Sequence, residues 1–422
     1  MLGIASDMNS PKKIILVIIH SSLGELNWIL PFISYLKENQ DNYDIVTLFF
    51  SDKLLESARN EGMLYKMLDQ NSRVIRKRQL LGFLLGNSSR IAYIFKDFWP
   101  ITSKSLAASI RSISSSAQLI LYPHAYALYS VSNKLSPYIH NSKKHDELVY
   151  DGLVLNSAYD INYWSERIAH DRIKVLGPLG YSAWWQRIVA METQDLVDAE
   201  RKFTGKFDQV IAFILRGPNG QYLSEEDYQR LMAEAITEFA NMSNTFIYVK
   251  PHPRQDISEV EKYLDSLPKN RFKVVDYNTF VLGRMTDFSV SFWSSAITDF
   301  LAIGTPTIEY FSFNGSCSLW LRTRDNAQTS FFDKLGLTLQ ARDKNSLRAA
   351  LKKMNDNIDE VRTEQLNNFS EVFENSEEVG EKMIQYLQQG TGSKKRSRVP
   401  MATLLKSYLH VFFASLKGTA GR

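Results

Sequence analysis

The sequence predicts an α/β protein with two parallel sheets, each covered by helices. Two observations lead to this prediction. Apolar runs of strand length alternate with helical patterns, and the alternation occurs in two successive blocks of a 422-residue chain. Continuous apolar runs such as residues 14–20 are typical of strands buried on both faces of a parallel sheet. The length suffices for two domains of ordinary size, and 44% hydrophobic with 23% charged residues is typical of a globular protein.

The first block covers residues 10–178. Strands are expected at residues 14–20, 43–50, 117–122, 148–155 and 173–176. A helix is expected over residues 24–37, and residues 52–115 have a largely helical pattern broken at Pro100. The Gly-Pro-Leu-Gly segment at 177–180 marks the expected crossing into the second domain.

The second block covers residues 179–389. Its strands are expected at residues 208–215, 245–249, 272–275, 287–292 and 307–310. Its helices are expected at residues 224–240, 257–264, from 294 onward, 344–353 and 360–388. Ser224 should cap the first of these helices, because three acidic residues follow it in the first turn.

Two short motifs in the second block predict a phosphate site. The strand ending at Val249 stops at Lys250-Pro251-His252-Pro253, because proline cannot donate to a sheet ladder. Ser294 and Ser295 follow a second strand and begin a helix, whose free N–H groups favour phosphate. Both motifs are expected at the carboxyl edge of one parallel sheet, where such sheets bind ligands. This arrangement indicates a nucleotide donor.

The two blocks and these motifs resemble the GT-B glycosyltransferase architecture, which has two Rossmann-like domains facing a central cleft. The ordered motifs over residues 208–312 are similar to a superfamily of bacterial surface-polymer enzymes. That superfamily contains CDP-glycerol glycerophosphotransferases. It also contains capsule transferases that use CMP-Kdo or CMP-sialic acid and carry His-Pro and Ser-Ser motifs. Residues 19–25 are similar to the segment that carries the catalytic base of lipid A Kdo transferases.

The resemblance implies that Lys250 and His252 hold the donor phosphate and that Ser294 and Ser295 donate hydrogen bonds to it. The alternatives are a rigid strand exit for the histidine and a simple N-cap for one serine.

Two further residues are candidates for binding the donor. Asp299 lies one helical turn after Ser295 and is expected to reach the ribose or the base, unless it only balances the helix dipole. Arg216 follows a strand and is expected to meet the negative charge of the donor.

The catalytic candidates lie in the first block. Glu25 follows the first strand and is the candidate general base for the acceptor hydroxyl, the alternative being a first-turn acid that stabilises its helix. His20 and His124 both end strands and are expected to line the cleft, although histidines at such positions are often structural.

Metal and cofactor motifs are missing from the sequence. No Asp-x-Asp triplet, Cys/His cluster or Walker-type glycine loop is present, so a metal-independent site without a cofactor is expected. Cys317 is the single cysteine; it excludes an internal disulfide and is expected to be inert in a reducing compartment.

The basic character of the chain belongs to its last segment. Residues 391–422 hold seven of the 50 Lys and Arg residues and none of the 46 acids, which argues against a nucleic-acid binder. Large apolar residues recur there at helical spacing, opposite Lys406, Ser407, His410 and Lys417. Residues 390–422 therefore predict a basic linker, including the cations at 394–398, and an amphipathic helix that binds an anionic membrane surface. The alternative is a terminal helix packed on the domain. Residues 73–90 are a second candidate membrane segment.

Together these observations predict a glycosyltransferase at the cytoplasmic face of the membrane, with a nucleotide-sugar donor and a lipid-linked glycan acceptor. Kdo or another acidic sugar from a CMP donor is favoured. The alternatives are a CDP-glycerol-type glycerophosphotransferase, a UDP-sugar 2-epimerase and a non-catalytic scaffold of the same fold. No signal peptide or membrane-spanning run is evident.

Overall fold

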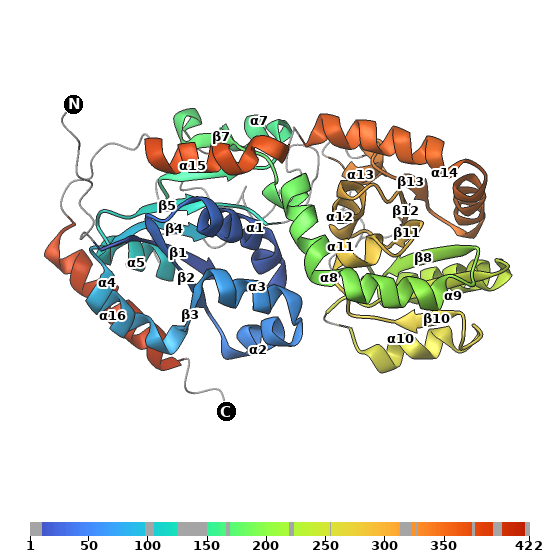
Figure 1. The fold of residues 1–422 in the computed structure, drawn as a ribbon, viewed down its shortest axis with the longest axis horizontal. Helices are drawn as coiled ribbons and strands as arrows, with labels where there is room; N and C mark the ends of the chain where they lie inside the picture. Colours follow the sequence, from blue (N-terminus) through green and yellow to red (C-terminus); the bar gives the residue numbers. More distant parts are fainter. Residues whose placement is uncertain are drawn as a thin grey trace.

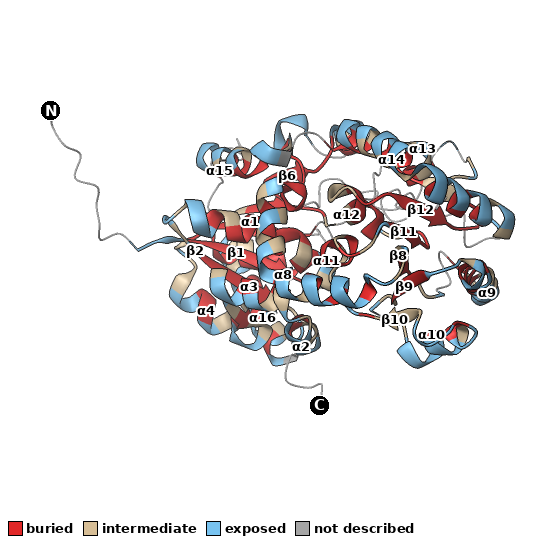
Figure 2. Ribbon diagram, turned by 45° about the vertical axis from the view of Figure 1, so that its right-hand side comes forward, coloured by how far each residue is buried: buried red, intermediate tan, exposed pale blue. Residues whose placement is uncertain are grey.

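Two α/β domains lie side by side and are joined by a long helix (Figure 1). The computed structural model describes residues 11–97, 105–124, 150–165, 169–218, 223–253, 255–312, 323, 325, 327–373, 376–390 and 399–417. The strands of both sheets are largely buried, and the helices turn exposed faces outward (Figure 2).

The first domain contains a seven-stranded parallel sheet of order β3-β2-β1-β4-β5-β6-β7. Its strands are β1 (Lys13–Ile19), β2 (Tyr43–Phe49), β3 (Arg73–Arg76), β4 (Ile91–Lys96), β5 (Gln118–Leu121), β6 (Gly152–Leu155) and β7 (Ile173–Val175). In β1, Ile15 and Val17 belong to one hydrophobic cluster, whereas Ile14 and Leu16 belong to another. Both faces of this sheet are therefore packed, which explains the continuous apolar run.

The two clusters assign the helices to the two faces of this sheet. One face is covered by α1 (Leu23–Asn39), α2 (Asp52–Asn60) and α3 (Met63–Asn71). The opposite face is covered by α4 (Leu80–Asn87), α5 (Leu106–Ile113), α7 (Ile161–Ser165) and α16 (Met401–Lys417). The last helix therefore belongs to the first domain (Figure 1).

The second domain contains a six-stranded parallel sheet of order β10-β9-β8-β11-β12-β13. Its strands are β8 (Gln209–Ile214), β9 (Thr245–Lys250), β10 (Phe272–Val274), β11 (Phe288–Ser291), β12 (Thr307–Tyr310) and β13 (Leu339–Ala341). Its helices are α9 (Glu225–Asn241), α10 (Ile257–Leu264), α11 (Thr279–Gly283), α12 (Ala296–Ala302), α13 (Phe331–Lys334) and α14 (Lys344–Val372). The predicted cap is confirmed, since the Ser224 hydroxyl accepts a hydrogen bond from the backbone N–H of Asp227.

The chain crosses between the domains twice. The first crossing leads through Leu179–Tyr181 into α8 (Ala183–Thr204). The second leads from α14 back to α15 (Val379–Gln389), where the Tyr93 hydroxyl of the first domain donates to the carbonyl of Leu387. A chain segment from the second half of the sequence thus completes the first domain.

The sequence-based prediction missed several elements of the fold. Residues 52–115 contain α2, α3, α4 and α5, as the helical pattern predicted, but β3 and β4 also lie within them and were missed. Strand β3 is only four residues long, and both strands border charged residues, which concealed them. The 22-residue helix α8 and the three-residue strand β13 were not predicted. Pro100, the predicted break, lies outside the described residues.

In both sheets, the strand order reverses next to the first strand of the domain. The reversal falls between β1 and β4 in the first sheet and between β8 and β11 in the second. Open parallel sheets bind ligands at the carboxyl ends of the strands at such a point. The topology therefore selects two edges, which we call the first edge and the second edge.

Candidate active site

Five ionisable side chains gather at the first edge. His20 follows β1, Lys96 and Asp97 end β4, His124 follows β5, and Glu25 lies in the first turn of α1. The last four line a pocket together with residues of β1 and α1. Glu25, Lys96 and Asp97 are each less than a tenth exposed, whereas the two histidines are partly exposed.

Glu25 closes the turn between β1 and α1. Its carboxylate accepts hydrogen bonds from the backbone N–H groups of His20 at 2.6 Å and Ser21 at 2.8 Å, and from the Ser21 hydroxyl at 2.5 Å. A carboxylate near a helix N-terminus is also stabilised by the helix dipole. Glu25 therefore holds the loop that carries His20, and most of its hydrogen-bonding capacity is used in doing so.

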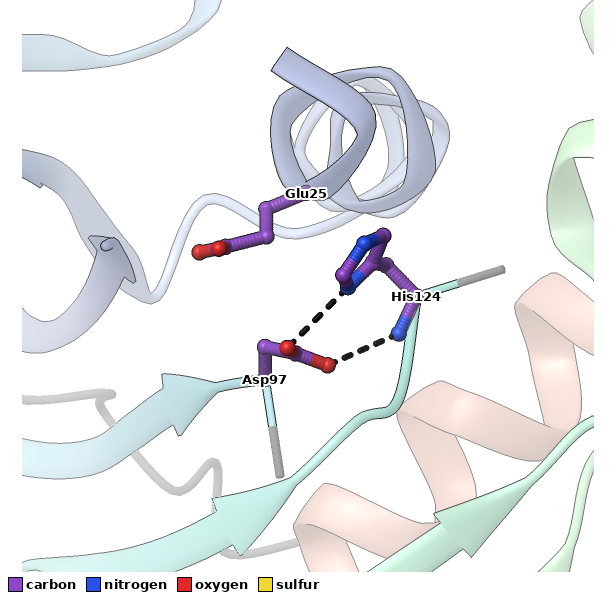
Figure 3. A group of neighbouring side chains, drawn as sticks. All are labelled: Glu25, Asp97 and His124. Atoms are coloured by element: carbon purple, nitrogen blue, oxygen red, sulfur yellow. Dashed lines mark hydrogen bonds and ion pairs between the residues drawn. The ribbon is translucent and has the colours of Figure 1, made fainter. Parts of the chain in front are cut away.

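His124 and Asp97 form a pair, and their side chains point toward each other (Figure 3). Nδ1 of His124 lies 3.0 Å from one Asp97 oxygen, and the backbone N–H of His124 donates to the other oxygen at 3.0 Å. An aspartate that accepts from Nδ1–H fixes the imidazole tautomer in which Nε2 is the proton acceptor. Nε2 lies 3.5 Å from the Ser22 hydroxyl.

Burial and neighbouring charges shift three pKa values at this edge. Burial alone would raise the pKa of Asp97, but the charge of His124 and its hydrogen bonds outweigh burial and lower it. Burial lowers the pKa of Lys96 to about 8, although Asp97 and Glu25 oppose the shift. Burial, reinforced by Lys96, lowers the pKa of His20. Shifts of this kind concentrate at functional sites.

The chemistry of a metal site is partly present at the first edge. Glu25, Asp97 and His124 offer ligand atoms within 4.8 Å of one another. However, the Glu25 and Asp97 oxygens already accept hydrogen bonds, and the amine of Lys96 lies close enough to act on both carboxylates. A bound cation would have to displace these donors and tolerate the lysine, so the donor set fits a metal poorly.

The second edge joins Arg216 to the segment that starts α12. Arg216 follows β8, and its guanidinium lies over the ring of Trp293 at 4.7 Å and within 3.4 Å of the Trp293 carbonyl. Ser294 and Ser295 come next: the Ser294 hydroxyl accepts from the N–H of Ala296, whereas Ser295 makes no side-chain cap and is exposed. The cation and the two serines therefore meet where the strand order reverses.

Lys250 and His252 follow β9 on the same edge. The amine of Lys250 lies 3.6 Å from the Asp276 carboxylate, and burial lowers its pKa. The backbone N–H of His252 donates to Gln255, which in turn bonds the Tyr228 hydroxyl. These bonds hold the Pro-His-Pro exit in one conformation and leave the imidazole partly exposed.

Asp299 lies on α12 at the boundary between the domains. It accepts hydrogen bonds from the Thr279 hydroxyl at 2.5 Å and from the Tyr181 hydroxyl at 3.2 Å. Burial raises the pKa of Asp299 to about 6, although these bonds and Lys250 oppose the shift. The Asp299 carboxylate therefore links α11 to the segment that crosses between the domains. To bind a ribose as well, it would have to accept further hydrogen bonds beside those from Thr279 and Tyr181.

The two edges approach each other. Asn27, one half-turn beyond Glu25 on α1, accepts a hydrogen bond at 3.2 Å from Asn278, which caps α11. Glu61 of the first domain lies close enough to Lys250 and Asp276 for their charges to act on it, and burial raises its pKa to about 7. Side chains from both domains therefore meet between the first and second edges.

The structure thus brings Glu25, His20 and His124 together at one edge. It places Arg216 and Lys250 at the other, together with the remaining donor candidates His252, Ser294, Ser295 and Asp299. The sequence analysis missed Lys96 and Asp97. The signal was present, since two charges directly follow the buried run of β4, but that strand had been taken for part of a helix. Cys317 lies outside the described residues.

We compared the chain with known protein families, curated proteins and solved structures. A model of the alpha-2,8-polysialyltransferase family matches residues 210–301, the segment that runs from β8 to α12. Comparison with curated proteins finds no match at the level of sequence. Solved structures match over most of the chain.

A putative UDP-N-acetylglucosamine 2-epimerase from Listeria monocytogenes matches with a TM-score of 0.59 at 11% identity, over 92% of this chain and 99% of that one. The wall teichoic acid polymerase TagF, soaked with CDPG, matches with a TM-score of 0.55 at 12% identity, over 90% of both chains. HepE of Anabaena, with UDP and glucose, matches with a TM-score of 0.54 at 12% identity, over 90% and 100%.

The chain has the GT-B fold. Its two parallel sheets with flanking helices match the two-domain architecture of these proteins over 90–92% of the chain. The predicted resemblance to GT-B proteins of surface-polysaccharide synthesis is confirmed by the family match together with these structures.

Proposed function

We propose that this GT-B chain is a glycosyltransferase of surface-polysaccharide synthesis, which moves a sugar from a nucleotide donor to a lipid-linked glycan. One observation carries the proposal. Arg216, Lys250, His252 and the serines at 294 and 295 all follow β8, β9 or β11 at one sheet edge, inside the segment that matches the polysialyltransferase family. Cations and free helical N–H groups at such an edge suit a phosphate.

The donor we favour is a CMP-linked acidic sugar, Kdo or a related sugar. The match to a polysialyltransferase family supports an acidic sugar, and the likeness to TagF soaked with CDPG is consistent with a cytidine nucleotide. In this proposal Lys250 and His252 bind the donor phosphate, and Arg216 adds a further positive charge. Asp299 positions α11 and α12 beside the ribose.

In the reaction, the acceptor hydroxyl attacks the anomeric carbon while the bond from that carbon to the donor phosphate breaks. Nε2 of His124 takes the hydroxyl proton, and Asp97 stabilises the imidazolium that forms. Lys250 and His252 receive the negative charge of the departing nucleotide, a role that a divalent metal plays in other transferases. The proposed site therefore needs no metal.

Glu25 was the first candidate for the base. We assign the proton to His124 because its Nε2 is directed away from its aspartate, whereas the Glu25 carboxylate already accepts three hydrogen bonds. In this assignment Glu25 is a positioning residue that holds the turn carrying His20 and Ser21.

The sequence analysis left three alternative functions open, and for two of them a solved structure with a similar fold is known. The likeness to TagF favours a glycerophosphotransferase, and the likeness to the Listeria protein favours a 2-epimerase. A non-catalytic scaffold is the third. We place the enzyme at the cytoplasmic face of the membrane, where nucleotide donors and lipid-linked acceptors meet.

A donor panel separates these functions. The full-length protein is incubated with CMP-Kdo, CMP-sialic acid, CDP-glycerol and UDP-N-acetylglucosamine, with and without glycan acceptors. Nucleotide release is measured, and products are identified by NMR. Release of CMP with transfer of the sugar supports the proposal. Transfer from CDP-glycerol, epimerisation of the UDP-sugar, or no binding of any donor would each support one of the alternatives instead.

A further inference from the structure

The exposed large hydrophobic side chains of this protein are unevenly distributed. Among the described residues, eleven large hydrophobic residues are exposed, and six of them lie on α16. These six are Met401, Leu405, Leu409, Phe412, Phe413 and Leu416, which are 41–77% exposed. A seventh, Leu85, is 67% exposed on α4, the helix that packs beside α16. Figures 1 and 2 both show these two helices together on the first domain. A gathering of this kind on one surface marks a contact site.

Helix α16 turns more large apolar side chains to solvent than to its domain. Its fully covered side chains are small, namely Ser407, Val411 and Ser415, and Val411 belongs to the hydrophobic core of the first domain. His410 hydrogen-bonds the Ser109 hydroxyl of α5 at 2.8 Å. The helix is thus anchored to the domain through these groups and through the partly buried Leu404 and Tyr408, whereas most of its large apolar side chains face solvent. The predicted separation into an apolar side and a polar side does not match this packing, since Ser407 was placed on the polar side.

The charge around this face is mainly positive, although Arg76 is paired with Asp52 and Arg90 with Asp44. Segment 73–90, which forms β3, the following turn and α4, contains five basic residues and no acid. Arg73 and Arg78 are exposed there, and Lys406 is exposed on α16 itself. No acid occurs in residues 399–417 either. An apolar surface bordered by a majority of cations, with Arg73, Arg78 and Lys406 exposed, is complementary to anionic lipid, where the cations meet headgroups and the apolar residues enter the acyl boundary.

We infer that α16 and α4 form one platform that docks the first domain on an anionic bilayer. The proposal gives the membrane prediction a defined surface, with α16 fixed to the first domain instead of serving as a free tail. None of the described helices is long and apolar enough to span a bilayer, and the platform lies flat on its domain. The inference deepens the proposed function, but vesicle binding needs no donor and can be tested apart from it.

Point substitutions test the platform better than deletion, because removing α16 would uncover the core beneath Val411. In the test variant Leu405, Phe413 and Leu416 are changed to Asp. In the matched control Met191, Phe203 and Ile257 are changed to Asp; these residues are 47–78% exposed and lie away from α16. Flotation is measured with phosphatidylcholine vesicles that contain or lack phosphatidylglycerol, and thermal unfolding confirms that each variant is folded.

The wild-type protein should float with the anionic vesicles and much less with the neutral ones. The Leu405/Phe413/Leu416 variant should lose at least about tenfold of its vesicle affinity, and the control should keep it. An Arg73→Gln, Arg78→Gln pair should weaken binding to the anionic vesicles alone. The inference is overturned if the wild-type protein binds neither vesicle or if the test variant floats as well as the control. It is also overturned if sedimentation shows that the face only joins two copies of the chain. Donor binding by the test variant reports separately on the proposed function.

Discussion

The two sheet edges hold similar numbers of ionisable groups, but these groups differ in burial and in pairing. At the first edge, Glu25, Lys96 and Asp97 are buried and bonded within the domain. At the second edge, Lys250 is paired with Asp276, but Arg216 and His252 remain partly exposed. Buried, paired groups fix the position and tautomer of a proton acceptor, whereas accessible cations are suited to an anion that arrives and leaves. The comparison assigns proton transfer to the first edge and phosphate binding to the second.

Replacing His124 should have the largest effect. Loss of a general base typically costs a factor of 10² to 10⁴, so we expect His124→Ala to lower kcat about 10³-fold while the donor affinity stays unchanged. Steady-state kinetics with a fixed acceptor measures both. His170→Ala, at an exposed histidine of the same domain, is the control. If a folded His124→Ala protein keeps a kcat close to that of the wild-type enzyme, His124 is not the general base.

Replacing His252 should have a smaller effect and a different signature. The His252→Ala change removes one electrostatic contact to the phosphate, and transfer should fall about 10²-fold, equivalent to about 2.7 kcal/mol. Part of this loss should come from weaker donor binding. If donor affinity is unaltered and only turnover changes, the second edge is not the phosphate site.

Lys96 makes the stability of the protein depend on pH. Burial lowers its pKa to about 8 from an ordinary 10.5. Between these values the unfolded chain binds the proton that the native protein releases, so stability rises with pH across this window and is lowest below it. At neutral pH the buried charge costs on the order of 3 kcal/mol.

Lys96→Met should therefore stabilise the protein at pH 7, and its advantage should disappear above pH 10.5. Denaturant unfolding at a series of pH values measures this. Lys262→Met, at an exposed position, should leave the curve unchanged. A Lys96→Met protein that is less stable than the wild type at pH 7 would show that the ammonium is needed by Asp97 and Glu25.

Glu25 should matter for stability more than for rate. A glutamine cannot accept from both backbone N–H groups and the Ser21 hydroxyl, so Glu25→Gln should lose about 1–3 kcal/mol of unfolding free energy. Nucleotide binding should be unchanged, and transfer should fall less than in His124→Ala. If Glu25→Gln instead keeps its stability and loses as much turnover as His124→Ala, Glu25 is the better candidate for the general base.

Much of the fold could be predicted because buried parallel strands are continuous apolar runs. The runs at residues 14–20 and 245–249 gave β1 and β9 nearly residue by residue. Short strands with charged borders, such as β3 and β13, carry too few apolar residues to differ from a helical pattern. Helix α8 has exposed Met191 and few buried positions, so its apolar stripe is weak.

The second edge could be predicted from the sequence, and the first edge only in part. Lys250 and His252 lie in a motif whose prolines reveal the strand end, so their position follows from local chemistry. Asp97 becomes meaningful only beside His124, 27 residues later in the sequence. That contact depends on the pairing of β4 with β5, which no local pattern encodes.

The division between the two edges is tested most directly by calorimetric titration of nucleotide into His124→Ala and His252→Ala, measured side by side with the wild-type protein. CMP is titrated first, and otherwise the nucleotide that the donor panel identifies. The account predicts that His124→Ala binds the nucleotide as tightly as the wild-type protein, whereas His252→Ala binds it at least about tenfold more weakly. Weaker binding by His124→Ala together with unchanged binding by His252→Ala would contradict it.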